Sequence, residues 1–315
     1  PRTLIRLNDG VGAIAMLDRL QSIGRIPADH RILRGDAEIF GGRFAQAIEA
    51  VEGDHSAEAW RIRALALVGM GEQDRAQAAF AQGASAPGQK SELLAAFARF
   101  ALDAGNMEQA RSLAGQSLAE QPGNLIALQV QARIAGMSGQ PERALAIYRG
   151  LARDNPGRID IQFGLIEALG SMRRFEEIEK VLKSAEKLAP DHPKILLYKA
   201  QLAAERHEWS KVRELLQPKE TYLGEMPELQ LLYAQALLEI GQIEQARAYL
   251  APLLLRAPDN ELVRILLARS QLAGDDAQAA VETLRPATLR ADPDPALMQL
   301  FESAIRQATG STGKV

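Results

Sequence analysis

The chain has 315 residues, of which 47% are hydrophobic and 24% are charged, and its formal net charge at pH 7 is −3. A nearly neutral chain gives no electrostatic reason to expect a nucleic-acid partner, and the absence of cysteine excludes disulfides, thiolate metal sites and cysteine nucleophiles. No stretch approaches the roughly 18 consecutive apolar residues of a membrane span, so we expect no transmembrane segment.

The first part of the chain, residues 1–27, carries Ala13 and Leu17 four positions apart, on one face of a helix. The same spacing marks the second helix of a unit that recurs along the rest of the chain. We therefore expect residues 1–27 to form a degenerate N-terminal half-repeat. Because the chain begins at Pro1 rather than at methionine, we interpret its start as trimmed or processed, and a signal peptide or an anchor before Pro1 would not be seen in this sequence.

A repeat with a period of 34 residues extends over residues 28–294. Its units start near residues 28, 57, 91, 125, 159, 193, 227 and 261, and the first unit is shorter than the others. Self-similarity of this length is typical of an array in which each unit packs only on its neighbours. Three residue types recur at fixed positions: glycine at Gly71, Gly105, Gly139 and Gly241, alanine at Ala76, Ala110, Ala144 and Ala246, and proline at Pro122, Pro156, Pro190 and Pro258.

Each unit is predicted to form two helices, as residues 91–124 illustrate. In the first half, apolar residues recur at three- and four-residue steps from Leu94 to Ala101, which predicts a helix. Gly105 follows, and glycine just past a helix end adopts the left-handed conformation without steric cost. The second half repeats the helical spacing until Pro122 ends it. The array is therefore predicted to be a helical hairpin repeated about eight times, without strands.

Two positions of each unit, the eighth and the twentieth, favour small side chains, which let two helices approach closely where they cross. The unit that starts at residue 159 departs from this rule, with Ile166 and Ile178 at the small positions and Arg173 in place of the glycine. We predict a wider hairpin there and a change in curvature. Most units instead hold alanine at both positions, as in the pairs Ala64 and Ala76, Ala98 and Ala110, and Ala132 and Ala144.

The repeats are followed by an amphipathic stretch over residues 295–308. We predict that it forms a capping helix, which covers the last apolar face of the array. Residues 309–315 are expected to form a flexible tail. Gly310 to Lys314 faintly resemble a phosphate-binding loop, but the spacing is too short and no helix can follow, so we predict no phosphate site.

The repeats resemble those of the tetratricopeptide repeat family, whose pattern sets tryptophan, leucine, glycine, alanine, phenylalanine and proline at fixed positions. The unit that starts at residue 57 matches best, although Arg63 stands where the pattern has leucine. Its matching residues are Trp60, Ala64, Leu67, Gly71, Ala76 and Phe80. The resemblance covers residues 28–294. It implies an all-α, right-handed superhelical solenoid of about eight hairpins with a C-terminal capping helix, whose first helices line a concave groove that binds a protein or peptide.

If the family's geometry holds, polar side chains of the first helices face this groove: Arg61, Arg99, Arg133, Glu167, Gln201, Glu205, Gln235, Glu239 and Arg269. Arginine dominates the first half of this set, and glutamate and glutamine dominate the second. This polarity predicts binding of an acidic or carboxylate-bearing segment, because the planar guanidinium suits carboxylate recognition. The alternative is a solvated helix face with its usual mixture of charges.

Some members of the family bind a C-terminal carboxylate through lysine and asparagine of one unit. The corresponding positions here hold Arg61 and Leu65, or Gln129 and Arg133. No asparagine occurs at any of them, so we do not expect chaperone-tail binding of that type.

No residue pattern in the chain predicts catalysis. The four histidines, His30, His55, His192 and His207, lack the spacing of metal ligands. We therefore predict no enzymatic activity, no cofactor, no metal site and no nucleic-acid partner.

The leading hypothesis is a non-catalytic scaffold for protein–protein interaction, which binds a peptide or protein segment in its concave groove. Two alternatives stay open: a periplasmic assembly component of a bacterial envelope or polysaccharide export system, and the recognition arm of a larger enzyme. The compartment is left open between cytoplasm and periplasm, with a bacterial origin as our guess, and the oligomeric state is not predicted.

Overall fold

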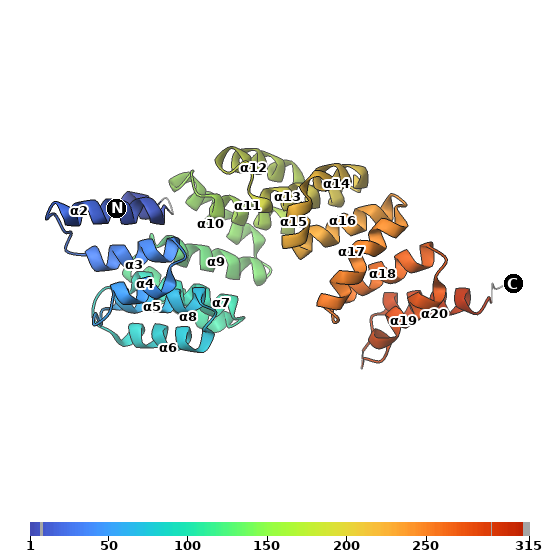
Figure 1. Cartoon of the computed structure of the whole chain (residues 1–315), viewed down its shortest axis with the longest axis horizontal. Helices are drawn as coiled ribbons and strands as arrows, with labels where there is room; N and C mark the ends of the chain where they lie inside the picture. Colours follow the sequence, from blue (N-terminus) through green and yellow to red (C-terminus); the bar gives the residue numbers. More distant parts are fainter. Residues whose placement is uncertain (7–8, 291, 311–315) are drawn as a thin grey trace. The chain divides into compact units, whose positions relative to one another are not determined.

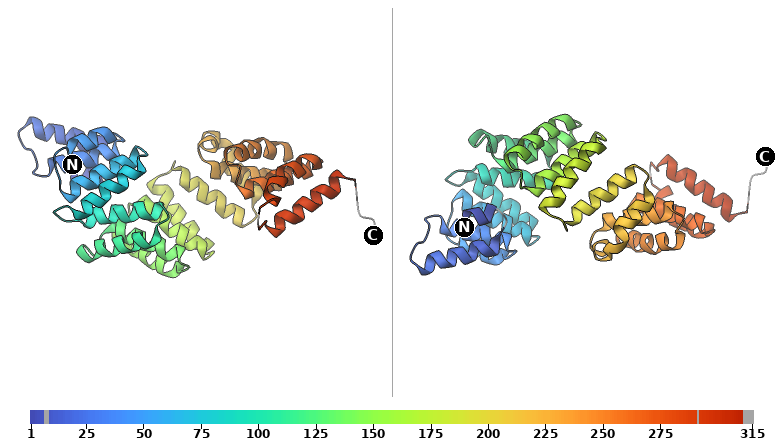
Figure 2. Two further views of the ribbon diagram at one scale, coloured as in Figure 1. Left: turned by 90° about the horizontal axis from the view of Figure 1, so that it is seen from below. Right: turned by 90° about the horizontal axis from the view of Figure 1, so that it is seen from above.

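The computed structural model of the chain describes residues 1–6, 9–290 and 292–310 (Figure 1). Every regular element in these ranges is a helix, which confirms the predicted all-α class. Within each of the two compact units of the chain, consecutive helices pack on one another as repeated hairpins, as a helical solenoid requires (Figure 2). Of the predicted tail, residues 311–315 lie outside the described residues.

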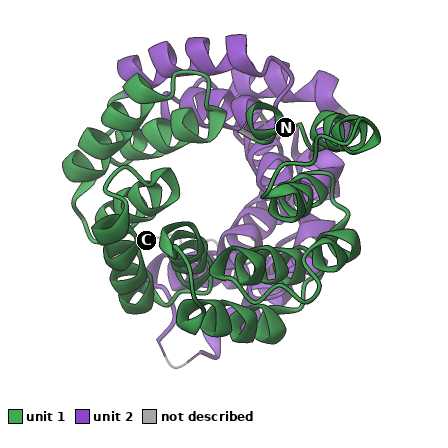
Figure 3. Cartoon of the chain, turned by 90° about the vertical axis from the view of Figure 1, so that its left-hand side faces the viewer, with its two compact units in different colours: residues 1–174 green, residues 175–315 purple. Residues whose placement is uncertain are grey.

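The chain divides into two compact units, residues 1–174 and 175–315 (Figure 3). The helices of the first unit are α1 (Arg2–Arg6), α2 (Gly10–Ser22), α3 (His30–Phe40), α4 (Phe44–Ala50), α5 (Ala57–Gly69), α6 (Gln73–Ser85), α7 (Ser91–Asp103), α8 (Met107–Glu120), α9 (Leu125–Met137), α10 (Pro141–Asp154) and α11 (Ile159–Ser171). Those of the second unit are α12 (Phe175–Leu188), α13 (Pro193–Glu205), α14 (Trp209–Leu216), the short 3-10 helix η1 (Gln217–Lys219), α15 (Glu220–Glu225), α16 (Pro227–Glu239), α17 (Ile243–Arg256), α18 (Glu261–Ala273), α19 (Ala277–Thr288) and α20 (Pro295–Ala308).

The first helices of successive hairpins begin at one phase of the repeat, and capping side chains fix several of these starts. Asn124 Oδ1 accepts a hydrogen bond from the backbone N–H of Ala127 at 3.0 Å, at the start of α9. Asn260 Oδ1 accepts one from Val263 N–H at 3.2 Å, at the start of α18. Because these caps satisfy backbone donors that have no partner inside the helix, the local sequence determines where each helix begins.

The turn inside each hairpin holds one residue in the left-handed conformation. In the full-length repeats φ is 79° at Gly71, 81° at Gly105, 71° at Gly139, 56° at Arg173, 57° at His207, 80° at Gly241 and 58° at Asp275. This conformation is unfavourable for a residue with a Cβ atom. The geometry of the hairpin, rather than the residue type, therefore imposes it on the three residues that are not glycine.

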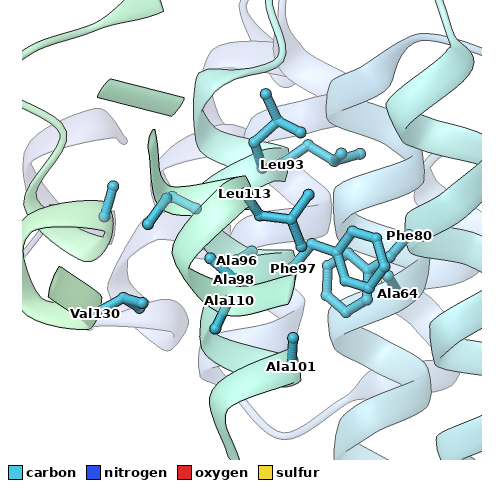
Figure 4. Close-up of a cluster of buried hydrophobic side chains, with 14 of the residues drawn as sticks. Ala64, Phe80, Leu93, Ala96, Phe97, Ala98, Ala101, Ala110, Leu113 and Val130 are labelled. Carbon is cyan, nitrogen blue, oxygen red and sulfur yellow. The ribbon is translucent and has the colours of Figure 1, made fainter. Parts of the chain in front are cut away.

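Small side chains allow the two helices of a hairpin to approach closely. Ala98 of α7 and Ala110 of α8 are both 0% exposed and lie in one buried cluster (Figure 4). Larger side chains fill the space between hairpins: the Phe80 ring of α6 stacks on the Phe97 ring of α7, with centroids 5.0 Å apart and an interplanar angle of 3°. The core therefore continues from one hairpin into the next, as expected for nearest-neighbour packing.

The hairpin that begins at α13 departs from the repeat in its second half. Its second helix, α14, ends at Leu216, because Pro218 follows and proline cannot continue a helical hydrogen-bond ladder. The segments η1 and α15 take up the residues before α16, and Leu223 of α15 is buried in the core. The next hairpin therefore stays in phase with the repeat.

The two isoleucines at the small positions of the unit starting at residue 159 are both buried. Ile166 lies in α11 and Ile178 in α12, which belong to different compact units. The widening of this hairpin therefore stays a prediction.

The two ends of the array each bury one helix face. At the N-terminal end, α2 packs on α3 and buries Ala13 and Leu17. At the C-terminal end, α20 packs on α18 and α19 and buries Leu297 and Ala304, whereas Ile305 is exposed.

We expect Asp275→Gly to raise the free energy of unfolding by about 0.5–1 kcal/mol, because glycine relieves the strain at positive φ. The reciprocal change Gly241→Asp, at the same position one repeat earlier, should lower it by a similar amount. Thermal denaturation of the full chain measures both. Midpoints that move in the same direction would contradict the assignment of strain to this turn.

Ala110→Leu should destabilise the chain by about 1–3 kcal/mol, because the buried position has no room for three further carbon atoms. Gly115→Ala in the same helix is the control, since an added Cβ there meets no heavy atom within 4 Å, and it should be stabilising by about 0.5–1 kcal/mol. Urea denaturation gives both values. An unchanged midpoint for Ala110→Leu would show that α8 does not approach α7 at Ala110.

Candidate functional site

The first helices of the hairpins line one side of the first compact unit. Helices α3, α5, α7, α9 and α11 contact one another in succession, whereas α4, α6, α8 and α10 pack on the first helices that flank them. We therefore take the side lined by the first helices as the concave side that a repeat array is expected to offer. We call this surface the inner face, defined by the side chains of Asp36, Arg61, Leu65, Arg99, Asp103, Gln129, Arg133, Met137, Asp160 and Glu167.

Ion pairs connect the first helices of successive hairpins. In the first unit, Arg61 Nη2 of α5 lies 2.8 Å from Asp36 Oδ1 of α3, and both side chains are largely buried. Arg133 Nη1 of α9 likewise lies 2.8 Å from Asp103 Oδ1 of α7. The structure thus places these two predicted groove arginines beside carboxylates of the preceding hairpin, which neutralise their charge.

The same ion pair recurs at the same repeat position in the second unit. There Arg269 Nη2 of α18 lies 3.0 Å from Glu239 Oε1 of α16, and this pair, like that of Arg133 and Asp103, joins residues 30 apart. The other predicted groove residues of that unit are exposed or half-buried on α13 and α16: Gln201, Glu205 and Gln235.

Arg99 is the exception among the predicted groove arginines. It occupies the position of Arg133 one repeat earlier, but the residue 30 positions before it is Gly69 rather than an acid. No carboxylate among the described residues forms an ion pair with Arg99. Gly69 is required for packing, because a Cβ there would lie 2.3 Å from Cζ of Phe44.

Arg99 reaches solvent, but protein surrounds much of its side chain. The side chain is exposed to solvent, yet desolvation by the surrounding protein lowers the pKa of its guanidinium from 12.5, against the opposing effect of the Asp103 carboxylate. A group that reaches solvent while protein encloses it on most sides lies in a hollow. Arg99 is therefore an exposed charged side chain that lines a hollow.

A second set of polar side chains, Gln129, Arg158 and Asp160, links α9 to α11. Arg158 donates two hydrogen bonds to Asp160, Nε to Oδ1 at 2.9 Å and Nη2 to Oδ2 at 2.7 Å, and Gln129 Nε2 donates to Asp160 Oδ2 at 2.9 Å. Partial burial acts to raise the pKa of the Asp160 carboxyl, but these hydrogen bonds outweigh it and the net pKa is lowered from 3.8. Asp160 is therefore ionised and held in place at neutral pH.

Tyr148 of α10 lies near Asp160 and Glu167 and stays protonated at neutral pH. Burial, together with the negative charge of Glu167, raises the pKa of Tyr148 to about 12. Its ring lies so close to α11 that a Cβ at Gly164 would be 2.1 Å from Cε1 of Tyr148. Tyr148 therefore serves to pack α10 against α11.

A pocket of about 370 Å³ opens next to Arg99, between α5, α6 and α7. Its residues are Leu65, Val68, Gln73, Asp74, Gln77, Phe80, Ala96, Arg99, Phe100, Asp103 and Ala104. The apolar members line its walls, and Arg99 adds a positive charge. This pocket was not predicted from the sequence. Leu65 was a signal for it, because every other unit carries a charged residue or glutamine at that position.

The described part of the chain offers no group of three or more histidine, aspartate or glutamate side chains that could hold a metal ion. Within the same residues, no helix combines the length and the apolar character needed to cross a bilayer.

Comparisons with known proteins agree with this architecture. Residues 221–269 match the family described as tetratricopeptide repeat. No curated protein sequence matches the chain. A chain in the crystal structure of the APC/C hetero-tetramer Cut9–Hcn1 has the same fold, with a TM-score of 0.73 and 16% identity, over 88% of this chain and 56% of that chain.

Two further solved structures share the fold. A tetratricopeptide repeat protein from Parabacteroides merdae matches with a TM-score of 0.56 and 16% identity, over 79% of this chain and 98% of that one. Yeast Tom70 matches with a TM-score of 0.55 and 12% identity, over 90% of this chain and 63% of that one. The chain thus spans 56% of the Cut9–Hcn1 chain and 63% of Tom70.

The repeated hairpins and their left-handed turns give the chain the fold of tetratricopeptide repeat solenoids, and the family match over residues 221–269 supports assignment to that class. In the first compact unit, Arg99 lines an apolar pocket and has no ion pair among the described residues.

The hydrogen bonds to Asp160 predict a pH dependence of stability. Because the folded-state pKa of Asp160 is lowered, its contribution is present above about pH 4, the unfolded-state value, and is lost as the pH falls through the folded-state value. Asp160→Asn should therefore be less stable than the unmodified chain at neutral pH, and this difference should shrink below about pH 4.

The control is Asp154→Asn, an exposed carboxyl at the end of α10. Urea denaturation between about pH 7 and pH 3 measures all three chains. A difference for Asp160→Asn that stays constant with pH would contradict the assigned ionisation.

Proposed function

We propose that the chain is a non-catalytic scaffold for protein–protein interaction, which binds a peptide or an extended protein segment along its inner face. The proposal depends on one observation, that the polar residues Arg99, Arg133 and Glu167 stand at the same position of three successive first helices in the first compact unit. A regular series of polar groups fits an extended segment, whose own backbone groups recur regularly.

The inner face combines the two kinds of contact that protein recognition uses. Apolar side chains around the pocket contribute affinity through burial, whereas charged groups such as Arg99 contribute specificity and register. The ion pairs at Arg61 and Arg133 keep most of the face electrically balanced, so a partner is selected by local charge and not by the net charge of the chain.

The comparisons support an interaction role in general terms. Cut9 of the matched structure belongs to a hetero-tetramer with Hcn1, and that assembly is a property of those proteins. For this chain, assembly with a partner is part of the proposal.

Photo-crosslinking tests whether a bound segment lies on the inner face. Peptides are first selected from a random decapeptide display library on the immobilised full chain. A photoreactive benzoylphenylalanine is then placed at Met137, which is 60% exposed and stands one repeat after Asp103 on the inner face. The control carries it at Gln116, an exposed position of the second helix α8.

We expect the selected peptides to crosslink at Met137 and not at Gln116. Library selection without enrichment, or crosslinks at Gln116 alone, would contradict binding on the inner face.

A further inference from the structure

We infer that Arg99 and the pocket between α5, α6 and α7 form a two-point binding site for a carboxylate side chain and a neighbouring large apolar side chain of an extended protein segment. This inference rests on the proposed function and specifies where on the inner face the segment binds and which residues it contributes.

The charged half of the site follows from the ion pairs between arginines and carboxylates on the inner face. Arg61 and Arg133 are each held by a carboxylate of the preceding hairpin, at 2.8 Å in both cases, so their charge is already balanced. At Arg99 the corresponding position is Gly69, which cannot be replaced by an acid without striking the Phe44 ring. The local packing thus leaves Arg99 without an ion pair to the preceding hairpin, although the nearby Asp103 carboxylate acts on its charge.

An external carboxylate is the group that complements Arg99. The guanidinium presents several N–H donors in one plane, which fits a carboxylate in a bidentate arrangement. Desolvation by the surrounding protein already acts on the charged form, as the lowered pKa of Arg99 indicates. A carboxylate of a bound segment would stabilise the charged guanidinium of Arg99.

The apolar half of the site is the pocket that Arg99 itself lines. Its walls are formed by Leu65 and Val68 of α5, Phe80 of α6, and Phe100 of α7. Its volume of about 370 Å³ lies near the lower end of the roughly 300–1,000 Å³ of ligand sites, which suits one large side chain better than a bulky ligand. Because Arg99 belongs to this lining, adjacent residues of one segment reach both halves.

The remaining polar residues of the pocket match a peptide backbone. Asp74, Gln73 and Gln77 lie on α6 along the same pocket, and their side-chain oxygens accept hydrogen bonds from backbone N–H groups. Asp103, the other acid of the pocket, forms its ion pair with Arg133 and only a longer-range charge interaction with Arg99. An acidic side chain next to an aromatic or long aliphatic one is therefore the motif that the site recognises.

Fluorescence anisotropy with defined peptides tests the site on the full chain. The probes are fluorescein-labelled octapeptides of Gly and Ser that contain the central pair Asp-Phe or Phe-Asp. The matched peptides replace Asp with Asn, to remove the charge, or Phe with Ala, to remove the apolar side chain. The protein variants are Arg99→Ala, Leu65→Gln, which places at this position the residue that later repeats carry, and the control Arg111→Ala on α8.

We expect at least one order of the pair to bind the unmodified chain about tenfold more tightly than its Asn and Ala versions. Arg99→Ala should abolish the preference for Asp over Asn but keep the preference for Phe over Ala. Leu65→Gln should have the opposite effect, and Arg111→Ala should change neither. This double dissociation separates loss of a contact from loss of folding.

An unchanged preference for Asp over Asn in Arg99→Ala would overturn the inference, as would the failure of both probe orders to bind the unmodified chain. In either case, crosslinking of library-selected peptides at Met137 would leave the proposed function standing. Failure of that crosslinking as well would contradict both.

Discussion

The structure depends on the close approach of the two helices within a hairpin, which an alanine on each helix allows in most of the repeats. Ala98 and Ala110 are completely buried, and the pairs of neighbouring repeats are buried in the same way. This contact fixes how one hairpin packs and therefore where the next one begins. Within each compact unit, residues at one repeat position therefore lie on successive first helices, and the same kind of ion pair over 30 residues occurs in each unit.

Local packing, in turn, determines the electrostatics of the inner face. An acid at the end of one first helix balances an arginine on the next, as at Asp103 and Arg133. At Gly69 the Phe44 ring occupies the space that a side chain would need, so Arg99 on the first helix of the next hairpin forms no ion pair there. A requirement of the core in one hairpin thus produces an available charge in its neighbour.

Much of the fold could be predicted from the sequence because its signals are local and repeated. Glycines at the turns and helical apolar spacing predict the hairpins, and the buried Ala98 and Ala110 agree with the predicted crossing of small residues. The end of α14 at Leu216 also has a local cause in Pro218. The pairing of groove arginines was not predicted, because each pair joins different hairpins and its geometry depends on their relative displacement. The pocket beside Arg99 needs side chains of three helices at once.

The left-handed turns make the later repeats less stable than the earlier ones. In the repeats up to Gly139 the turn residue is glycine, whereas Arg173, His207 and Asp275 hold the same conformation at an energetic cost. In an array stabilised by nearest neighbours, local opening begins where the units are least stable and spreads from there. Heating should therefore loosen the repeats beyond residue 173 first, while the hairpins that carry Arg99 and its pocket stay folded longest.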